Sequence, residues 1–125
     1  MYEVTVKRSF SAAHALAIGG KCEQLHGHNF GVEVTIGSAD LSPEGLVIDF
    51  RLLKAWLDEI IGNLDHRFLN DVPVLRGTNP TSEHIAKHIF DCISGRQDLG
   101  CLRVISVTVS ESDNSRATYR GDWNG

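Results

Sequence analysis

The chain has 125 residues, of which 42% are hydrophobic and 22% charged, a composition typical of a folded globular protein and not of a disordered one. This length predicts a single domain over residues 1–125. The formal net charge of −4, without any basic block, argues against nucleic acid as a partner. The apolar stretches are too short to cross a bilayer, so a membrane protein is not expected.

Two segments near the start alternate between apolar and polar residues, as a strand with one buried face does. The first runs from Tyr2 to His14, and the second is centred on Phe30–Ile36. A loop at Gly19–Lys21 separates them. A turn is predicted at Ser42–Gly45, because its proline presets one turn angle and its glycine accommodates the next.

Two helices are predicted to follow. The first begins near Asp49, a good N-cap, and carries an apolar stripe at helical spacing: Leu52, Leu53, Trp56, Leu57, Ile60, Ile61 and Leu64. The second opens at Asn79–Glu83, where a capping side chain, an early proline and a glutamate suited to the helix dipole coincide. It ends at Gly95, and its stripe consists of Ile85, Ala86, Ile89, Phe90 and Ile93.

Two further strands are predicted, from Leu102 to Glu111 and roughly from Arg116 to Gly121. The order β-β-α-α-β-β predicts an α+β fold, with a four-stranded antiparallel sheet and both helices on one face. The other face is mostly polar, and nothing in the sequence covers the two sheet edges. Natural sheets manage such edges by pairing or closure, so we expect an oligomer in which edges join between subunits.

Three histidines are predicted to converge. His26 and His28 are two residues apart on a predicted strand, so both rings leave the same face. His14 ends the neighbouring strand, and its ring reaches the other two if the strands pair as a hairpin. Three neutral imidazoles without a fourth protein ligand are typical of a catalytic zinc site, although other borderline metals also accept them. The alternative is that the His-x-His sequence is incidental.

Other ionisable residues leave alternatives open. His84 and His88 lie at i and i+4 of the second helix, but they lack the glutamate of a His-Glu-x-x-His motif and are interpreted as surface or partly buried residues. Asp65 orients His66 only if the backbone turns between them; otherwise the pair is a solvated helix end. Glu111, at the end of an apolar strand face, is either simply exposed or grips the N–H groups of a ligand.

The cysteines argue for a reducing compartment, the cytoplasm, because three cannot all pair and none forms a Cys-x-x-Cys motif. Cys92 and Cys101 are predicted to be inert packing thiols. Cys22 differs, since it lies in a loop four residues before the His-Gly-His sequence that begins at His26.

These motifs together resemble those of the 6-pyruvoyltetrahydropterin synthase / 6-carboxytetrahydropterin synthase family. The most specific is Cys-x-x-x-His-Gly-His combined with the upstream Ala-His and the later Asp-His. The matching segments cover nearly the whole chain: Phe10–His14, Cys22–His28, Ile48–Phe50, Leu64–His66, Leu69–Asp71, Asn79–Glu83, Glu111 and Tyr119–Gly121. The resemblance implies the T-fold (tunnelling fold), whose subunits join their sheets into a barrel of trimers and stack two trimers into a hexamer.

The resemblance also implies roles in catalysis. Cys22 matches the catalytic proton acceptor, and His66 with Asp65 matches a proton relay contributed by a neighbouring subunit. Three residues match the zinc ligands: His14, His26 and His28. The expected substrate is 7,8-dihydroneopterin triphosphate. The Asn-Pro-Thr-Ser-Glu stretch looks more like the carboxytetrahydropterin branch, which serves queuosine biosynthesis and releases acetaldehyde and triphosphate.

Binding of the substrate is implied at a second set of residues. Glu111 matches the carboxylate that anchors the pterin ring, and Thr81 and Ser82 lie where the family's pterin pocket is lined. A triphosphate also needs basic groups, and the cations near the motifs are either such groups or ordinary surface charges. They are Lys21, which we favour, Arg116 and Arg120.

One departure from the branch's pattern concerns Glu23, which directly follows Cys22 and occupies the Glu-x-x-His-Gly-His position. That motif marks a sister branch that forms 6-hydroxymethyl-7,8-dihydropterin for folate synthesis. We therefore hypothesise that the enzyme forms both products, with Glu23 as the alternative base; otherwise Glu23 is a solvated loop residue. A 6-pyruvoyl-type synthase, a non-catalytic metal- or pterin-binding module and a structural assembly protein are further alternatives.

Overall fold

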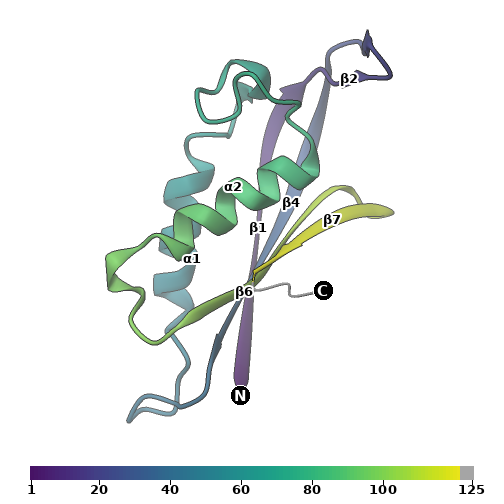
Figure 1. Ribbon diagram of the computed structural model, residues 1–125. Coiled ribbons are helices and arrows are strands. Elements are labelled where there is room, and N and C mark those ends of the chain that lie inside the picture. Colours follow the sequence, from purple (N-terminus) through teal and green to yellow (C-terminus); the bar gives the residue numbers. More distant parts are fainter. Residues whose placement is uncertain (122–125) are drawn as a thin grey trace.

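The fold is organised around a long antiparallel hairpin (Figure 1). The computed structural model describes residues 1–121, and for Lys21 and Cys22 it describes the backbone only. Strands β1 (Tyr2–His14) and β4 (His26–Ser38) pair along their whole length, and His14 lies opposite His26 at one end. Alternate residues are buried, as the sequence predicted. Tyr2 is 53% exposed, because the start of β1 extends beyond the helices.

A small second hairpin connects the two long strands. Strand β2 (Ala17–Ile18) pairs antiparallel with β3 (Lys21–Cys22), and Ala17 lies opposite Cys22. Gly19 and Gly20 form the turn with φ values of 62° and 79°. Two consecutive positive φ values are the requirement of a type I′ turn, and glycine meets it without strain. The loop predicted here is therefore a tight hairpin that ends four residues before His26.

The sheet has five strands in the order β5-β1-β4-β6-β7, and the predicted four-stranded antiparallel sheet was wrong in this respect. The four long strands are antiparallel, with β6 (Arg103–Ser112) beside β4 and β7 (Ser115–Arg120) at one edge. The fifth, β5 (Arg67–Phe68), runs parallel to β1 at the other edge. A strand of two residues carries no periodicity, so no sequence pattern reveals it.

Two helices cover one face of the sheet (Figure 1). Helix α1 (Phe50–Ile61) packs against β1, and α2 (Ser82–Ser94) packs against β6 and β7. The predicted N-cap Asp49 is confirmed, since its side chain accepts a hydrogen bond from the Arg51 N–H. Among the capping side chains offered by Asn79–Glu83, the N-cap of α2 is Thr81, which accepts from the His84 N–H. Short 3-10 helices, η1 (Leu69–Asp71) and η2 (Gln97–Leu99), complete the elements.

The core lies between this helix layer and the sheet. It contains most of the predicted stripes of both helices together with Phe10, Phe30 and the alternate apolar residues of β4. Leu52 is an exception, 47% exposed, because the stripe of α1 is narrower than predicted. Cys92 and Cys101 are exposed, so their prediction as packing thiols was wrong. Cys92 precedes the buried Ile93 on α2 and lies at the margin of its apolar stripe.

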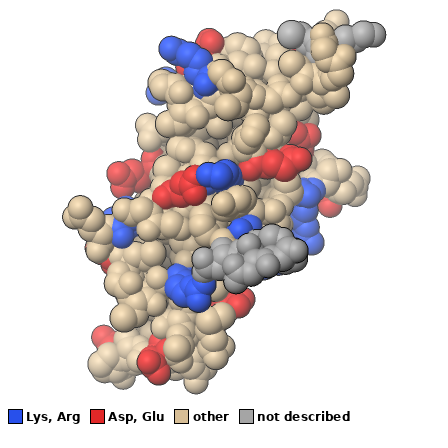
Figure 2. All heavy atoms as spheres, in the orientation of Figure 1, with Lys and Arg blue, Asp and Glu red and all other residues tan. Residues whose placement is uncertain are grey.

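The surface carries charges of both signs. On the face shown in Figure 2, Lys and Arg side chains are interspersed with Asp and Glu. Along α2, the exposed residues Glu83, Lys87 and Asp91 follow one another at four-residue spacing, and Lys87 pairs with Asp91 at 2.7 Å. Within the described residues, no helix is both long and apolar enough to cross a membrane.

Candidate metal centre

The three histidines predicted as ligands lie together at the end of the β1–β4 hairpin. His14 is the last residue of β1 and is fully buried, whereas His26 and His28 begin β4. One ring nitrogen from each lies within 4.8 Å of the other two. The Nε2 atoms of His14 and His26 are 3.1 Å apart. The strand register produces this convergence, because His14 pairs with His26 and His28 lies on the same face two residues further on.

Backbone carbonyls fix the protonation of two of these rings. Nδ1 of His14 donates to the carbonyl of Pro80 at 2.9 Å, and Nδ1 of His26 donates to the carbonyl of Gln24 at 3.0 Å. A carbonyl only accepts, so in a neutral ring the proton is on Nδ1 and Nε2 carries a lone pair. Metal-bound histidines are typically oriented in this way.

The spacing of these lone pairs fits a cation. Two nitrogen lone pairs that face each other repel unless a positive centre lies between them. Two imidazoles on one tetrahedral zinc, each at about 2.05 Å, have nitrogens about 3.3 Å apart. The observed distance between Nε2 of His14 and Nε2 of His26, 3.1 Å, is close to that value.

His28 supplies the third nitrogen. Its Nε2 is buried and has no hydrogen-bond partner among the described residues, an arrangement that costs free energy unless another group binds there. Burial lowers the pKa of His28 below its ordinary value; Glu111 opposes this shift, and His14 and His26 add to it. A neutral ring with an unused nitrogen is a ligand for a borderline metal, so the three residues fit a zinc-type ion.

Glu111 lies at the rim of the histidine cluster. Its Oε1 is 3.7 Å from Nε2 of His14 and its Oε2 is 3.8 Å from Nε2 of His28, both too long for hydrogen bonds. The Ser82 hydroxyl donates to Oε1 at 3.4 Å, while the Thr81 hydroxyl is occupied by the helix cap. The carboxylate is 32% exposed and is therefore available to N–H groups of a bound molecule.

Asp65 and His66 form a pair because the backbone turns between them. His66 has a φ of 58°, the change of direction that the sequence analysis required, and its Nδ1 lies 3.0 Å from Oδ2 of Asp65. Hydrogen bonding to the Ser11 N–H, followed by the effect of His66, holds the pKa of Asp65 below its ordinary value. The His66 side chain is 82% exposed. His66 lines a surface hollow together with residues of β1 and β4, including His28, but within residues 1–121 no hydrogen bond joins it to the three histidines.

The remaining predicted residues flank the hairpin or β7. The side chains of Cys22 and Lys21 lie outside the described part of the chain. Their backbone forms β3, directly before the exposed Glu23, whose N–H donates to the carbonyl of Leu16 at 2.7 Å. Arg116 and Arg120 are exposed on β7.

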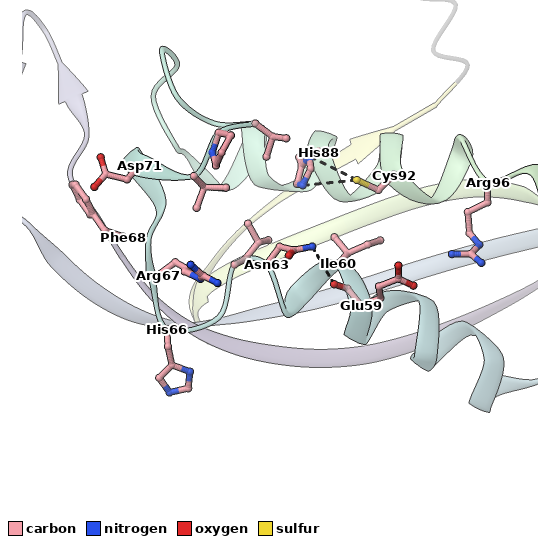
Figure 3. Close-up of a pocket in the computed structure, with 14 residues that line it drawn as sticks. Glu59, Ile60, Asn63, His66, Arg67, Phe68, Asp71, His88, Cys92 and Arg96 are labelled. Atoms are coloured by element: carbon pink, nitrogen blue, oxygen red, sulfur yellow. Dashed lines mark hydrogen bonds between the residues drawn. The ribbon is translucent and has the colours of Figure 1, made fainter.

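A separate cavity of about 820 Å³ lies on the helix side of the sheet, between α1, α2 and residues 66–74 (Figure 3). His88 and Cys92 project into it, with Sγ of Cys92 3.8 Å from both ring nitrogens of His88, whereas His66 points away. Although Cys92 is an exposed residue, the partial burial of its thiol in this cavity, followed by Asp91, raises the pKa of that thiol, and burial lowers the pKa of His88. None of the three clustered histidines lines this cavity. On α2, His88 is partly buried and His84 is exposed, as the sequence analysis predicted for these two residues.

Two asparagines that the sequence analysis left without a role bind the backbone that follows His14. Asn70 bonds to both backbone groups of Ala15, and Asn79 to both backbone groups of Ala17. Each partner is more than fifty residues away along the chain. The only local signal is that both asparagines belong to motifs of the family resemblance, which does not indicate what they contact.

Comparison with known proteins places the chain in a family. The sequence profile of the 6-pyruvoyl tetrahydropterin synthase family matches residues 3–122. The chain belongs to this family. It is 42% identical over 125 residues to the 6-carboxy-5,6,7,8-tetrahydropterin synthase of Synechocystis sp., covering 95% of this chain and 93% of that protein.

Two further relatives show how the family varies. The chain is 40% identical over 90 residues to the dihydroneopterin monophosphate aldolase of Pyrococcus furiosus, which covers 72% of this chain and 73% of that one. The structure resembles the 6-pyruvoyl tetrahydropterin synthase of Caenorhabditis elegans with a TM-score of 0.79 at 32% identity, over 98% of both chains. The fold is therefore the T-fold, with one short parallel strand added to the predicted sheet.

Proposed function

We propose that this protein is a zinc-dependent 6-carboxy-5,6,7,8-tetrahydropterin synthase. It converts 7,8-dihydroneopterin triphosphate and one water molecule into 6-carboxytetrahydropterin, acetaldehyde and triphosphate, a step of queuosine biosynthesis in the cytoplasm. The observation that carries the proposal is the convergence of three imidazole nitrogens, two of them with their protons fixed elsewhere, beside the Glu111 carboxylate. The 42% identical relative with this name supports the choice of reaction.

The chain's residues divide the work. Zinc held by His14, His26 and His28 would supply Lewis-acid polarisation of the substrate's side-chain hydroxyls. The Cys22 thiolate acts as a general base and removes a proton from the substrate carbon next to these hydroxyls. Glu111 accepts hydrogen bonds from N–H groups of the pterin ring and so holds the substrate with its reacting carbon next to Cys22. Ser82 and Thr81 line the pocket of the ring.

The return of a proton requires a second subunit. His66, oriented by Asp65, donates a proton to the intermediate in the active site of a neighbouring chain. Its exposure and its position directly before β5, the edge strand of the sheet, suit such a role. We propose a hexamer of two stacked trimers, with Lys21 binding the triphosphate.

A second activity is favoured by Glu23, which is exposed and directly follows Cys22. A carboxylate at this position would act as an alternative base and yield 6-hydroxymethyl-7,8-dihydropterin. The 40% identical relative named dihydroneopterin monophosphate aldolase supports this possibility. Replacing Glu23 by Ala tests it: the yield of the hydroxymethyl product is expected to fall, and an unchanged yield would rule the role out.

The decisive experiment is to incubate the purified, zinc-loaded protein with 7,8-dihydroneopterin triphosphate and to identify the pterin by mass. We expect 6-carboxytetrahydropterin together with acetaldehyde. A 6-pyruvoyl product would move the protein to another branch of the family. Binding of the pterin without turnover would favour a non-catalytic module. Full activity of the Cys22→Ala variant would contradict the role of Cys22 as the general base.

A further inference from the structure

The β2–β3 hairpin, which carries Cys22, is held from outside by one side chain. Asn79 Oδ1 accepts a hydrogen bond from the Ala17 N–H at 2.7 Å, and Asn79 Nδ2 donates to the Ala17 carbonyl at 2.6 Å. The side-chain amide thereby bonds to β2 as a neighbouring strand would. Since N–H groups only donate and carbonyls only accept, the two bonds also fix which way the amide faces.

The residue that Asn79 holds is the one opposite Cys22. Ala17 and Cys22 are paired across the hairpin, and the next pair is closed by the bond from the Glu23 N–H to the Leu16 carbonyl. In an antiparallel pair, the backbone groups of alternate residues point outward. Those of Ala17 are therefore free to meet Asn79, while the neighbouring pair joins the two strands.

The hairpin needs such support, because each of its strands has only two residues. An isolated two-stranded ladder is marginally stable even when it is longer. The exposed Ala17 and Ile18 contribute no buried apolar contact. Asn70, which bonds to Ala15 at 2.9 and 2.7 Å, holds the same segment two residues closer to His14.

Asn79 also ties the hairpin to the metal centre through its neighbour in the chain. The carbonyl of Pro80 accepts the Nδ1 proton of His14. The carbonyl of Asn79 is itself bonded to the ring of His84 and to the N–H of Thr81 at the start of α2. Two consecutive residues thus set the hairpin and a metal ligand relative to each other.

We propose that Asn79 is a positioning residue for Cys22, and that its pairing with Ala17 fixes the hairpin beside the three histidines. The catalytic consequence rests on the proposed function, in which Cys22 is the base. The structural part, that Asn79 holds the hairpin closed, stands independently and is tested without substrate.

The variants are Asn79→Ala, which removes both hydrogen bonds, and Asn79→Asp, which keeps an acceptor for the Ala17 N–H and loses the donor. Asn63→Ala is the matched control, because Asn63 is an exposed asparagine with a single long bond of 3.4 Å to the Glu59 carbonyl. Circular dichroism and metal content establish that each variant is folded and loaded. If Asn79→Ala does not fold, the comparison is made with Asn79→Asp.

Amide hydrogen exchange at Glu23 gives the first readout, since this N–H reports the closed hairpin but does not itself bond to Asn79. We expect it to exchange roughly tenfold faster in Asn79→Ala, less so in Asn79→Asp, and unchanged in Asn63→Ala. An unchanged rate in both Asn79 variants would overturn the proposal.

The steady-state kinetics of the metal-loaded variants give the second readout. Loss of orientation at the base is expected to lower kcat roughly ten- to a hundredfold while KM changes less than about threefold. A KM effect alone, or a loss of bound metal that accounts for the fall in kcat, would overturn the positioning of Cys22. If the wild type itself shows no turnover, the proposed function fails, and the exchange result alone decides whether Asn79 holds the hairpin.

Discussion

Phe30 connects the core to the metal centre, and its removal is expected to weaken both. The side chain is fully buried, stacks on Phe10 with ring centroids 5.1 Å apart, and contacts the rings of His14 and His28 at 5.4 Å. Phe30 therefore packs against two of the three ligand rings from the side of the hydrophobic core.

The magnitude follows from this burial. Replacing a buried Phe by Ala costs about 3–5 kcal/mol, of which the aromatic pair accounts for about 0.5–1.5 kcal/mol. For a chain of this length, 1 kcal/mol corresponds to roughly 3–5 °C in Tm, so Phe30→Ala is expected to lower Tm by roughly 9–25 °C. Phe30→Leu keeps most of the volume and is expected to cost about 1–2 kcal/mol.

The assay is thermal unfolding followed by circular dichroism, at one protein concentration because an oligomer's Tm depends on it. Phe50→Ala is the control, since Phe50 is about half exposed at the start of α1. Metal content measured on the folded Phe30→Leu variant is expected to fall, because the ligand rings lose their support. A Tm for Phe30→Ala equal to that of Phe50→Ala, or full metal retention in Phe30→Leu, would refute the reasoning.

Three further outcomes are expected. Glu111→Gln should keep the metal and raise KM for the pterin by roughly ten- to a hundredfold, since a charge-assisted bond is replaced by a neutral one; an unchanged KM would contradict the anchoring role. The pKa of Asp65 is depressed in the folded chain, so its contribution to stability is present above its unfolded pKa and is lost as pH falls through the folded pKa. The free energy of unfolding of Asp65→Asn should therefore be lower than that of the wild type at neutral pH and equal to it in acid. A difference that stays constant with pH would contradict this. Because the pKa of Cys92 is raised, its alkylation near neutral pH, followed by peptide mass, should be slower than that of free cysteine; an equal or faster rate would contradict the shift.

The regular elements could be predicted because their signals are local. The thirteen-residue alternation of β1 and the helix caps at Asp49 and Thr81 are encoded within a few residues of one another. The two-residue strand β5 could not be predicted, because its pairing with Ala12 and Ala13 depends on where the chain turns after α1. The exposure of Cys92 depends on which flank of α2 faces the sheet, which spacing alone does not fix.

Some features of the candidate site could likewise be predicted from the sequence, and others could not. The convergence of three histidines follows from two strands and a register, so it could be expected from the sequence once a hairpin was assumed. The carbonyl partners of His14 and His26 and the pairing of Asn79 with Ala17 could not, because hydrogen bonds between a loop and a distant backbone leave no periodic trace. The orientation of His66 by Asp65 depends on a positive φ at His66, and histidine at that position does not indicate one.

Metal content after exhaustive dialysis tests the central claim most directly. Elemental analysis should find zinc or a similar divalent ion bound stoichiometrically to the wild type, and the ion should be lost in His14→Ala, His26→Ala and His28→Ala. His84→Ala, which removes an exposed histidine of α2, should retain it. Failure of the wild type to hold any such ion, or its retention when these three imidazoles are removed together, would contradict a metal centre at this end of the hairpin.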